Sequence, residues 1–591
     1  MLLIQHQSFQ LPPCLPNART SSSLTPIGHD LRPGKLRLSV VSIIAACKWM
    51  IPRLVVVSCL FLASSAQILH LTPGRILGFD YETKKGVYAE VFLNIPYASA
   101  PVGELRFEKP TPPKPWKDIR DCTKFGPSCY PVTPDAVVPP EQPSEDCLTL
   151  NIIRPKKEVP SPGFPILFWV HGGGYEFGSA VAYGYKGMAD IYIPRDIIVV
   201  TIQYRLGVYG FFSTGDSRMP GNLGLFDMAE ALKFIHTNAE SFGGDPSRIT
   251  VWGHSAGSAA VGQLILSPVT RDYIPRSIEM SGSAWASFAQ GAAVANYSLE
   301  LAQVLGCSGN IKDCMKQKSV DEIYKGIEKV HPDEMTAASP PKVSLIGLTN
   351  KEAALFTIKR VAPFMHKFGI DPADYPNWNR DRLITELKKI VQKVYTGDHL
   401  EEVLKEIIGY YVDRGEVKEF EFYINRYTEF LSDLLFVVPT LDGLLARRDA
   451  GWDIYAYSLE HYNDATWNKD VPKKLRGPAH GCEFPYIKGT HFVENIQEGE
   501  ANAEEQVITE VFQQSFIEFV KIGAPSNDHE VWLDVGTDAN IRYLLITPNP
   551  QMKQGFYNES TAFWHKIREY GFDIVQLLPT EKSSKEVKEE L

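Results

Sequence analysis

The feature of this sequence that most constrains its fold is a series of short apolar runs that each end at a glycine-rich turn. Residues 165–170 lead into HGGG, residues 197–203 into YRLG, and residues 249–252 into GHSAG. Between the last two runs, Leu225, Met228, Leu232 and Ile235 recur at helical spacing. Strand-length runs that alternate with helical patterns predict an α/β fold with a mostly parallel central sheet flanked by helices.

Length and composition favour one large globular domain, which we place at residues 67–575. Of the 591 residues, 44% are hydrophobic and 22% charged, enough for a sizeable core. The net charge is −10 and no long basic run occurs, so neither nucleic acid nor an anionic membrane surface is expected as a partner. Residues 111–143 are rich in proline and predict an irregular surface segment, whereas residues 359–435 predict helices with charged outer faces.

The first 66 residues resemble a leader that contains a secretory signal. From Met50 the chain has a basic residue, Arg53, an apolar run at 54–62, and small residues that end at Ala66. An N-terminal membrane anchor is the alternative, but Lys48 and Arg53 interrupt the apolar stretch. We therefore expect no stable membrane span in the mature chain.

The other end of the chain also contains a possible targeting signal. Residues 576–591 form a charged tail whose last four residues, KEEL, resemble the address that a receptor reads to retain proteins in the endoplasmic reticulum. The alternative is an acidic, solvated tail. With Asn296 and Asn558 as glycosylation acceptors, these features predict the lumen of the endoplasmic reticulum, or secretion, with a retention receptor as a possible partner.

The sequence GHSAG at 253–257 matches the pattern of a nucleophile elbow. It follows a strand and precedes a run of small residues that can begin a helix. A serine on so tight a strand-to-helix turn projects its hydroxyl above the sheet, and only residues without bulky side chains can flank it. Ser255 is therefore the candidate nucleophile.

The HGGG turn can supply the hydrogen-bond donors that attack by a serine requires. Backbone N–H groups of Gly173 and Gly174, together with that of Ala256, can meet at one oxyanion. Each such donor contributes about 3–4 kcal/mol of transition-state stabilisation. A phosphate-binding loop is the alternative, but no P-loop lysine follows the glycines.

A serine nucleophile also needs a base and an acid, which in this arrangement follow it in the order acid, then histidine. Spacing alone cannot identify the base, because seven histidines follow Ser255. No clustered His and Cys ligand pattern occurs, so we expect neither a metal nor an organic cofactor. The seven are His366, His399, His461, His480, His491, His529 and His565.

Several longer stretches resemble the type-B carboxylesterases, the family that includes the cholinesterases, and among them the gut esterases of nematodes in particular. The resemblance extends from about Gly78 to Asp573. Besides the elbow, it rests on NIPYASAPVGELRF (94–107), SEDCLTLNI (144–152), HGGGYEFG (171–178), GNLGLFD (221–227) and FGGDPSRIT (242–250).

This resemblance implies an α/β-hydrolase fold and the rest of a catalytic triad. Glu352, in GLTNKEAALF, takes the position of the acid, and His480, in GPAHGCEF, takes the position of the base. One departure lies after Val330, where the P-x-x-D-G-x-F segment of family members is absent. A second is His254, where relatives commonly have glutamate; we expect this histidine to be structural and to point away from Ser255.

The resemblance also implies two disulfides. It pairs Cys129 with Cys147 and Cys307 with Cys314, and it leaves Cys122 and Cys482 free.

Together, these features predict a serine carboxylic-ester hydrolase that acts on apolar, small-molecule esters through an acyl-enzyme on Ser255. A cholinesterase is disfavoured because residues 130–146, inside the first disulfide loop, contain no tryptophan to hold a quaternary ammonium. The alternative from another class is a catalytically impaired adhesion or binding protein of the cholinesterase-like kind. All three triad positions are occupied, which favours the enzyme.

Overall fold

The protein is represented by a computed structural model that describes residues 67–136, 142–289, 291, 294–330, 343–359, 368–415, 419–489 and 502–579. All of these residues belong to one compact unit, Ala66–Leu591. The expected leader at 1–66, the KEEL sequence and most of the segment after Val330 lie outside the described residues.

A sheet of 13 strands forms the centre of the described structure. Its order is β1-β2-β3-β5-β7-β6-β8-β9-β10-β11-β12-β13, with β4 beside β2. In this spatial order, every strand from β7 to β12 runs parallel to its neighbours within that stretch. The neighbours from β1 to β7 pair antiparallel, and so do β12 and β13. The strands are β1 (Gln67–Leu71), β2 (Gly74–Glu82), β3 (Tyr88–Pro96), β4 (Arg120–Asp121), β5 (Thr149–Pro155), β6 (Phe164–Val170), β7 (Ile198–Ile202), β8 (Gly244–His254), β9 (Arg276–Met280), β10 (Val343–Thr349), β11 (Ile454–Leu459), β12 (Arg542–Ile546) and β13 (Gln551–Gln554).

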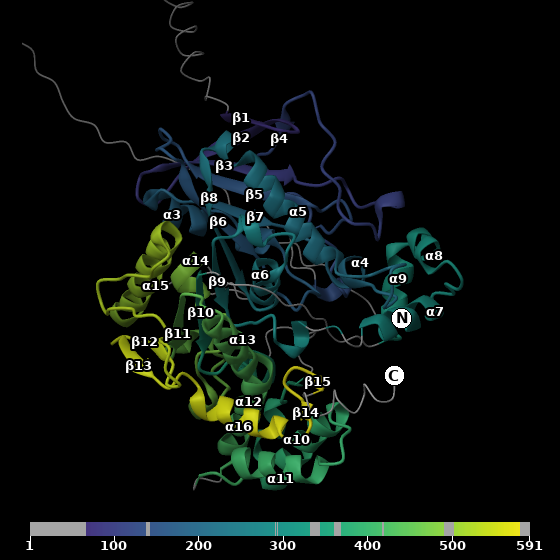
Figure 1. Ribbon diagram of the computed structural model, residues 1–591, viewed down its shortest axis with the longest axis vertical. Helices are drawn as coiled ribbons and strands as arrows, with labels where there is room; N and C mark the ends of the chain where they lie inside the picture. The colour runs from purple at the N-terminus through teal and green to yellow at the C-terminus, as the bar shows by residue number, and fades with distance from the viewer. Residues whose placement is uncertain are drawn as a thin grey trace, which may run out of the picture. The chain divides into compact units, whose positions relative to one another are not determined.

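Helices cover both faces of this sheet (Figure 1). One face packs against α5 (Leu223–Asn238) and α6 (Ala256–Leu266), and the other against α3 (Lys186–Tyr192), α14 (Phe484–Lys488) and α15 (Ala503–Ile522). Because both faces are covered, the central strands are apolar throughout, and every residue of β6 and β7 is buried. The expected α/β fold with a mostly parallel sheet is confirmed.

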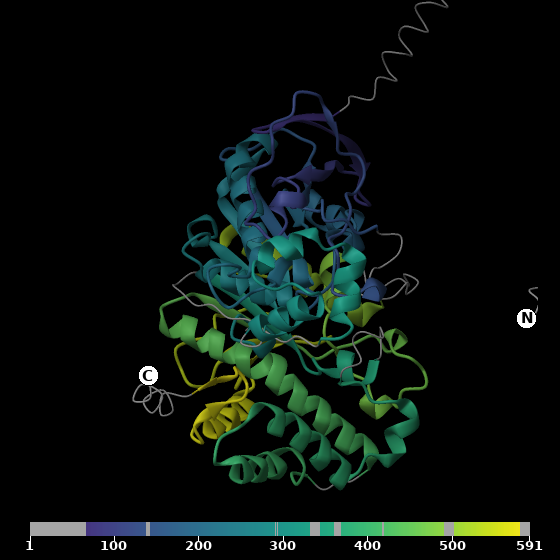
Figure 2. The ribbon, with the colours of Figure 1, turned by 90° about the vertical axis from the view of Figure 1, so that its right-hand side faces the viewer.

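A separate group of helices lies beyond the end of the sheet, below it in Figure 2. It includes α10 (Arg380–Val394), α11 (Leu400–Tyr411), α12 (Phe420–Ser432), α13 (Val438–Asp449) and α16 (Asn558–Arg568). Their apolar faces form a core of their own, except that α13 also places Leu441 and Leu444 in the core against the sheet. The helical pattern expected at 359–435 is present in its described residues. A π-helical turn, Asp433–Val437, joins α12 to α13.

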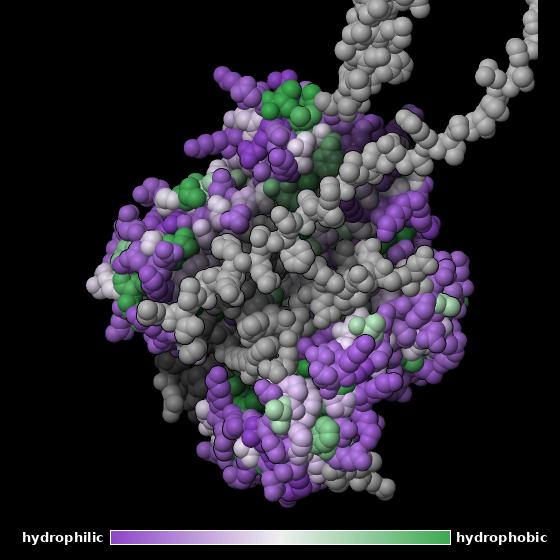
Figure 3. Space-filling model, turned by 180° about the vertical axis from the view of Figure 1, so that it is seen from behind, coloured by the Kyte–Doolittle hydropathy of each residue, from purple (hydrophilic) through white to green (hydrophobic). Residues whose placement is uncertain are grey.

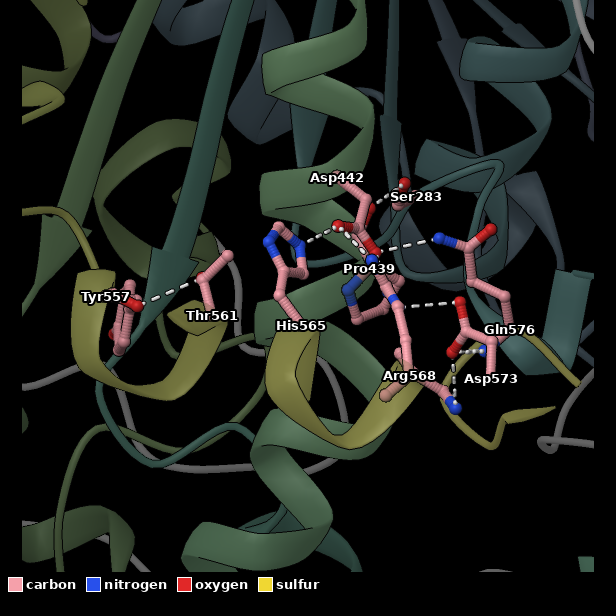
Figure 4. Close-up of polar contacts among 10 residues, drawn as sticks. Ser283, Pro439, Asp442, Tyr557, Thr561, His565, Arg568, Asp573 and Gln576 are labelled. Atoms are coloured by element: carbon pink, nitrogen blue, oxygen red, sulfur yellow. Dashed lines mark hydrogen bonds and ion pairs between the residues drawn. The ribbon is translucent and has the colours of Figure 1, made fainter. Parts of the chain in front are cut away.

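Asp442 on α13 holds the C-terminal part of the chain against this group (Figure 4). Its carboxylate accepts hydrogen bonds from His565 Nε2 at 2.8 Å and Gln576 Nε2 at 2.7 Å, and it forms an ion pair with Arg568. Leu578–Pro579 also pairs with a short strand at Phe572–Asp573. The described chain therefore ends in this short strand pair, at Pro579.

Glycine also determines how the chain passes from α5 into β8. Helix α5 ends at Asn238, and a 3-10 turn, Ala239–Phe242, follows. Gly243 adopts φ 82°, and Gly244 is already the first residue of β8. The left-handed conformation therefore turns the chain directly into the strand.

The described residues on the face shown in Figure 3 are mainly hydrophilic. Large apolar side chains that are exposed include Ile68, Val269, Ile522 and Val531. Within the described ranges, we find no helix long and apolar enough to span a bilayer.

Candidate active site

Ser255 lies on the turn between β8 and α6, where the sequence placed a nucleophile elbow. Its backbone has φ 58° and ψ −127°, a strained conformation for a residue with a side chain. Its N–H donates to the carbonyl of Met280, and its own carbonyl accepts from Ala259 N in the first turn of α6. Among the five residues of GHSAG, Ser255 is partly exposed and the other four are buried.

The glycines around Ser255 are required by close backbone contacts. A Cβ atom on Gly257 would lie 2.6 Å from the carbonyl oxygen of His171, and one on Gly172 would lie 2.9 Å from Ser255 Cβ. Real Cβ atoms do not approach so closely. The HGGG turn is therefore packed directly against the elbow.

The HGGG turn itself is closed by hydrogen bonds to Gly173, whose carbonyl accepts from Glu176 N at 2.9 Å and Phe177 N at 3.0 Å. Gly173 and Gly174 have φ values of 114° and 62°, which glycine adopts without strain. His171 at the start of the turn is fully buried, and this burial lowers its pKa to about 4. We therefore regard His171 as a neutral, structural side chain.

Glu352 follows the end of β10 and is completely buried. Its Oε1 accepts hydrogen bonds from Thr349 N at 2.6 Å and from Ser281 Oγ at 2.7 Å. Its Oε2 lies 2.7 Å from His480 Nδ1. The carboxylate is thus fixed on one side by the protein and directed at the imidazole on the other.

His480 is the histidine, among the seven after Ser255, that the structure places against Glu352. The other ring nitrogen, Nε2, has no hydrogen-bond partner among the described residues. The rings of Phe436 and Phe356 lie 4.7 Å and 5.6 Å from the imidazole, centroid to centroid. Two of the other candidates, His366 and His491, lie outside the described residues.

Two polar residues of this site were not identified from the sequence. Ser281 follows β9 with φ 51°, and its hydroxyl bridges Glu352 and a second buried carboxyl, Glu483 Oε1, at 3.3 Å. Tyr457 OH also donates to Glu483 Oε1 at 3.4 Å. Burial and the nearby Glu352 raise the pKa of Glu483 above its ordinary value, which favours the protonated carboxyl. The signal that could have indicated Ser281 was its position directly after a parallel strand.

The side chain of His254 was expected to point away from Ser255 and to be structural. It is fully buried, and its ring packs against His480 at 4.3 Å and Phe484 at 4.6 Å, centroid to centroid. Burial, with smaller contributions from His480 and Lys488, holds the pKa of His254 well below its ordinary value. His254 therefore contacts the candidate base as a neutral ring.

An apolar cavity of about 110 Å³ adjoins the HGGG turn. Because Gly174 is part of its wall, a group attached to a carbonyl in the oxyanion position could enter it. Its other lining residues are mostly aliphatic or aromatic and include Val132, Tyr175, Val208, Phe211, Phe212, Phe288, Val294, Leu301, Ile327 and Val330.

The structure contains disulfides between Cys129 and Cys147 and between Cys307 and Cys314, and it leaves Cys122 and Cys482 as thiols. The first disulfide is attached close to the sheet, since Cys147 directly precedes the segment that enters β5 at Thr149.

The two predicted glycosylation acceptors differ in environment. Asn296 is exposed on α7 (Val294–Val304). Asn558 is partly buried at the start of α16, where its Nδ2 donates to Asn540 Oδ1 at 3.0 Å. Asn296 is therefore the more accessible of the two side chains.

Comparison with known proteins places this site in a family. A sequence model described as the Carboxylesterase family matches residues 65–564. Gut esterase 1 of Caenorhabditis elegans is 37% identical over 543 residues, which cover 86% of this chain and 94% of that protein. Carboxylesterase 3B of Mus musculus is 29% identical over 539 residues, which cover 83% and 90%. The chain therefore belongs to the carboxylesterase family and is a carboxylic ester hydrolase.

Proposed function

We propose that the protein hydrolyses apolar carboxylic esters through an acyl-enzyme on Ser255. In the first half-reaction, Ser255 Oγ attacks the ester carbonyl while His480 Nε2 takes the hydroxyl proton. The carbonyl oxygen becomes an oxyanion that accepts hydrogen bonds from the N–H groups of Gly173, Gly174 and Ala256. Collapse of this intermediate breaks the bond to the alcohol oxygen, which leaves with the proton from His480.

The second half-reaction repeats these steps with water. His480 takes a proton from the water, whose oxygen attacks the acyl carbon, and Ser255 Oγ then leaves and regains the proton. The products are the carboxylic acid and the free serine. Glu352 holds the imidazole with Nδ1 protonated and stabilises the imidazolium in both halves.

The observation that best supports this proposal is the 2.7 Å contact between Glu352 Oε2 and His480 Nδ1, which leaves Nε2 without a partner among the described residues. With Nδ1 held by Glu352, Nε2 is the nitrogen that is left to take a proton from the nucleophile. The strained backbone conformation of Ser255 is typical of functional residues.

The test of the mechanism is hydrolysis of p-nitrophenyl acetate by the wild-type protein and by Ser255→Ala. Loss of the nucleophile is expected to lower turnover on the order of a million-fold. Ser287→Ala is a matched control, because Ser287 is also buried but lies in a separate 3-10 turn. A Ser255→Ala protein that is folded and as active as the control would contradict the mechanism.

The cavity beside Gly174 supports a preference for apolar substrates. Each methylene that enters an apolar pocket contributes about 0.8 kcal/mol, or roughly fourfold in kcat/KM. A series of p-nitrophenyl esters from acetate to hexanoate is therefore expected to show rising kcat/KM until the cavity is filled. A flat or falling series would contradict the preference.

Charge can be tested separately from size by comparing acetylcholine with 3,3-dimethylbutyl acetate, which has the same shape without the positive charge. We expect the neutral ester to be the better substrate. A clear preference for acetylcholine would favour a cholinesterase instead, because it would require a site that holds the cation.

We also propose that the protein acts in the lumen of the endoplasmic reticulum, with secretion as the alternative. The two disulfides support passage through an oxidising compartment. Deletion of residues 588–591 is expected to release the protein into the medium if KEEL is read by a retention receptor. Equal secretion with and without these residues would contradict retention.

A further inference from the structure

The loop that leads to His480 needs support from elsewhere in the protein. β11 ends at Leu459, and the chain then runs through short turns for 20 residues before it reaches the candidate base. A base must be held within a fraction of an ångström of its working position, which loops alone do not ensure. The side chains that fix this loop are therefore of functional interest.

The backbone of the turn that carries Glu352 already pairs with this loop. Lys351 N donates to the carbonyl of Pro478 at 3.0 Å, and His480 N donates to the carbonyl of Glu352 at 3.3 Å. Lys351 and Ala479 form an isolated parallel bridge between the two segments. The acid and the base are thus joined by backbone contacts next to their side-chain contact.

The side chain of Lys351 extends this contact to the earlier part of the loop. Its Nζ lies 3.1 Å from the carbonyl oxygen of Arg476, 3.3 Å from that of Leu475 and 3.5 Å from that of Lys474. It also donates to Asn425 Oδ1 on α12 at 2.8 Å. All these acceptors are neutral oxygens, so the ammonium ties three successive carbonyls of the loop together without a carboxylate.

The path of this side chain explains a glycine in the loop. A Cβ atom on Gly477 would lie 2.6 Å from Lys351 Cδ and within 3.3 Å of its Cγ and Cε. The aliphatic part of Lys351 therefore crosses the loop at the point where a side chain is missing. Burial lowers the pKa of Lys351 to about 8, so the charged form is retained at neutral pH.

We propose that Lys351 is a positioning residue for catalysis, whose ammonium fixes the loop that carries His480 to the turn that carries Glu352. This inference rests on the proposed function, since it requires His480 to be the base. It concerns the placement of the imidazole and not the chemistry of any bond. Its effect should therefore appear in kcat more than in KM.

The test compares the wild-type full chain with Lys351→Met, which has nearly the same shape but no donor. Folded Lys351→Met is expected to lose roughly 10- to 100-fold in kcat for p-nitrophenyl acetate, with KM changed by about twofold or less. The matched control is Lys316→Met on α8 (Ile311–Gln317). Lys316 Nζ also donates to a backbone carbonyl, that of Glu104 at 2.7 Å, and it forms an ion pair with Glu108 at 2.9 Å. It lies outside the site, so stability should fall while kcat stays unchanged.

A second variant keeps the test decisive if Lys351→Met does not fold. Gly477→Ala retains the ammonium but displaces its aliphatic chain, and it should lower kcat in the wild-type background. Gly409→Ala on α11 is its control, because a Cβ atom there meets nothing within 4 Å and kcat should stay unchanged. Wild-type kcat in Gly477→Ala, or in a folded Lys351→Met, would overturn the proposal.

The wild type and Ser255→Ala are assayed beside these variants. An inactive wild type, or an active Ser255→Ala, would contradict the proposed function. An active wild type and an inactive Ser255→Ala, combined with an unaffected Lys351→Met, would contradict only the role of Lys351.

Discussion

The hydroxyl of Ser281 donates a hydrogen bond of 2.7 Å to Glu352 Oε1, on the side of the carboxylate opposite His480. The two residues follow the ends of adjacent parallel strands, β9 and β10. Ser281 reaches this position with φ 51°, a conformation that costs about 1–3 kcal/mol in a residue with a side chain. The fold therefore holds a strained serine against the acid of the candidate triad.

Replacing Ser281 with glycine tests the contribution of this hydroxyl. Glycine adopts φ 51° without strain, so Ser281→Gly removes the hydroxyl and its contacts with Glu352 and Glu483 without straining the backbone. A hydrogen bond to a charged group contributes about 1.5–3 kcal/mol, so kcat is expected to fall by about tenfold or more. Wild-type kcat in the folded variant would show that Thr349 N alone orients Glu352.

Glu352→Gln should lower kcat far more than Ser281→Gly does. An amide cannot stabilise the imidazolium and can stabilise the wrong tautomer of His480, which in a comparable triad lowers kcat by about 10⁴-fold. Steady-state kinetics at neutral pH measures the effect. Glu352→Asp is the matched control, because it keeps the charge and should recover part of the activity. Equal activities of the two variants would contradict a role for the carboxylate charge.

Glu483 should make stability depend on pH. Its pKa is raised in the folded protein by burial and by Glu352, so between the ordinary glutamate value of about 4.3 and the raised value the folded chain binds the extra proton. The free energy of unfolding should therefore decrease as pH rises through this window. Glu483→Gln removes the titration and should flatten this part of the profile in urea unfolding experiments. An unchanged slope would contradict the assignment.

Asp442 should make stability depend on pH in the opposite direction, so that stability falls as the pH is lowered. Burial opposes its ionisation, but hydrogen bonds and charge from His565 and Arg568 outweigh burial and lower its pKa. Its contribution to stability is present above the ordinary aspartate pKa of about 3.9 and is lost as pH falls through the lowered value. Asp442→Asn is expected to cost about 2–4 kcal/mol at pH 7, with a smaller difference from the wild type in acid.

Urea unfolding of Asp413→Asn is the control for that experiment. Asp413 pairs with Arg380 through side chains that are both about half exposed, so Asp413→Asn should lose much less stability than Asp442→Asn. Equal effects of Asp442→Asn and Asp413→Asn would show that the cluster in Figure 4 does not hold the C-terminal part of the chain.

Gly172→Ala tests the contact between the HGGG turn and the elbow. Its Cβ atom would lie 2.5 Å from the His254 carbonyl oxygen and 2.9 Å from Ser255 Cβ, so the two turns must separate. A displacement near 1 Å is expected to lower kcat by about 100-fold. Gly409→Ala on α11 is the control, because its Cβ would meet nothing within 4 Å and alanine should even stabilise the helix. Normal kcat in Gly172→Ala would contradict the tight packing.

Local sequence patterns predicted the parts of the site that depend on local geometry. The elbow at Ser255 and the turn at Gly173 each follow a buried strand, and the glycines that such turns need are visible in the sequence. The parallel sheet was predictable for the same reason, since strands and helices alternate along the sequence. Glu352 and His480 came from family resemblance, because no spacing rule selects one histidine of seven.

The remaining contacts join segments far apart in the sequence. Ser281 and Glu483 are 202 residues apart, and the contact between His254 and His480 joins the end of β8 to the loop before α14. Lys351 stood in the quoted motif beside Glu352, but nothing in the sequence indicated that its side chain would cross Gly477. Only the folded arrangement of the strands brings these residues together.

The measurement that tests the account most directly is identification of the residue that carries the acyl group. The wild-type protein is treated with a fluorophosphonate probe, digested, and mapped by mass spectrometry, with Ser255→Ala treated in parallel. We expect a single adduct on the peptide that contains Ser255, and none in the variant. An esterase-active protein labelled at another residue, or labelled equally in Ser255→Ala, would contradict Ser255 as the nucleophile.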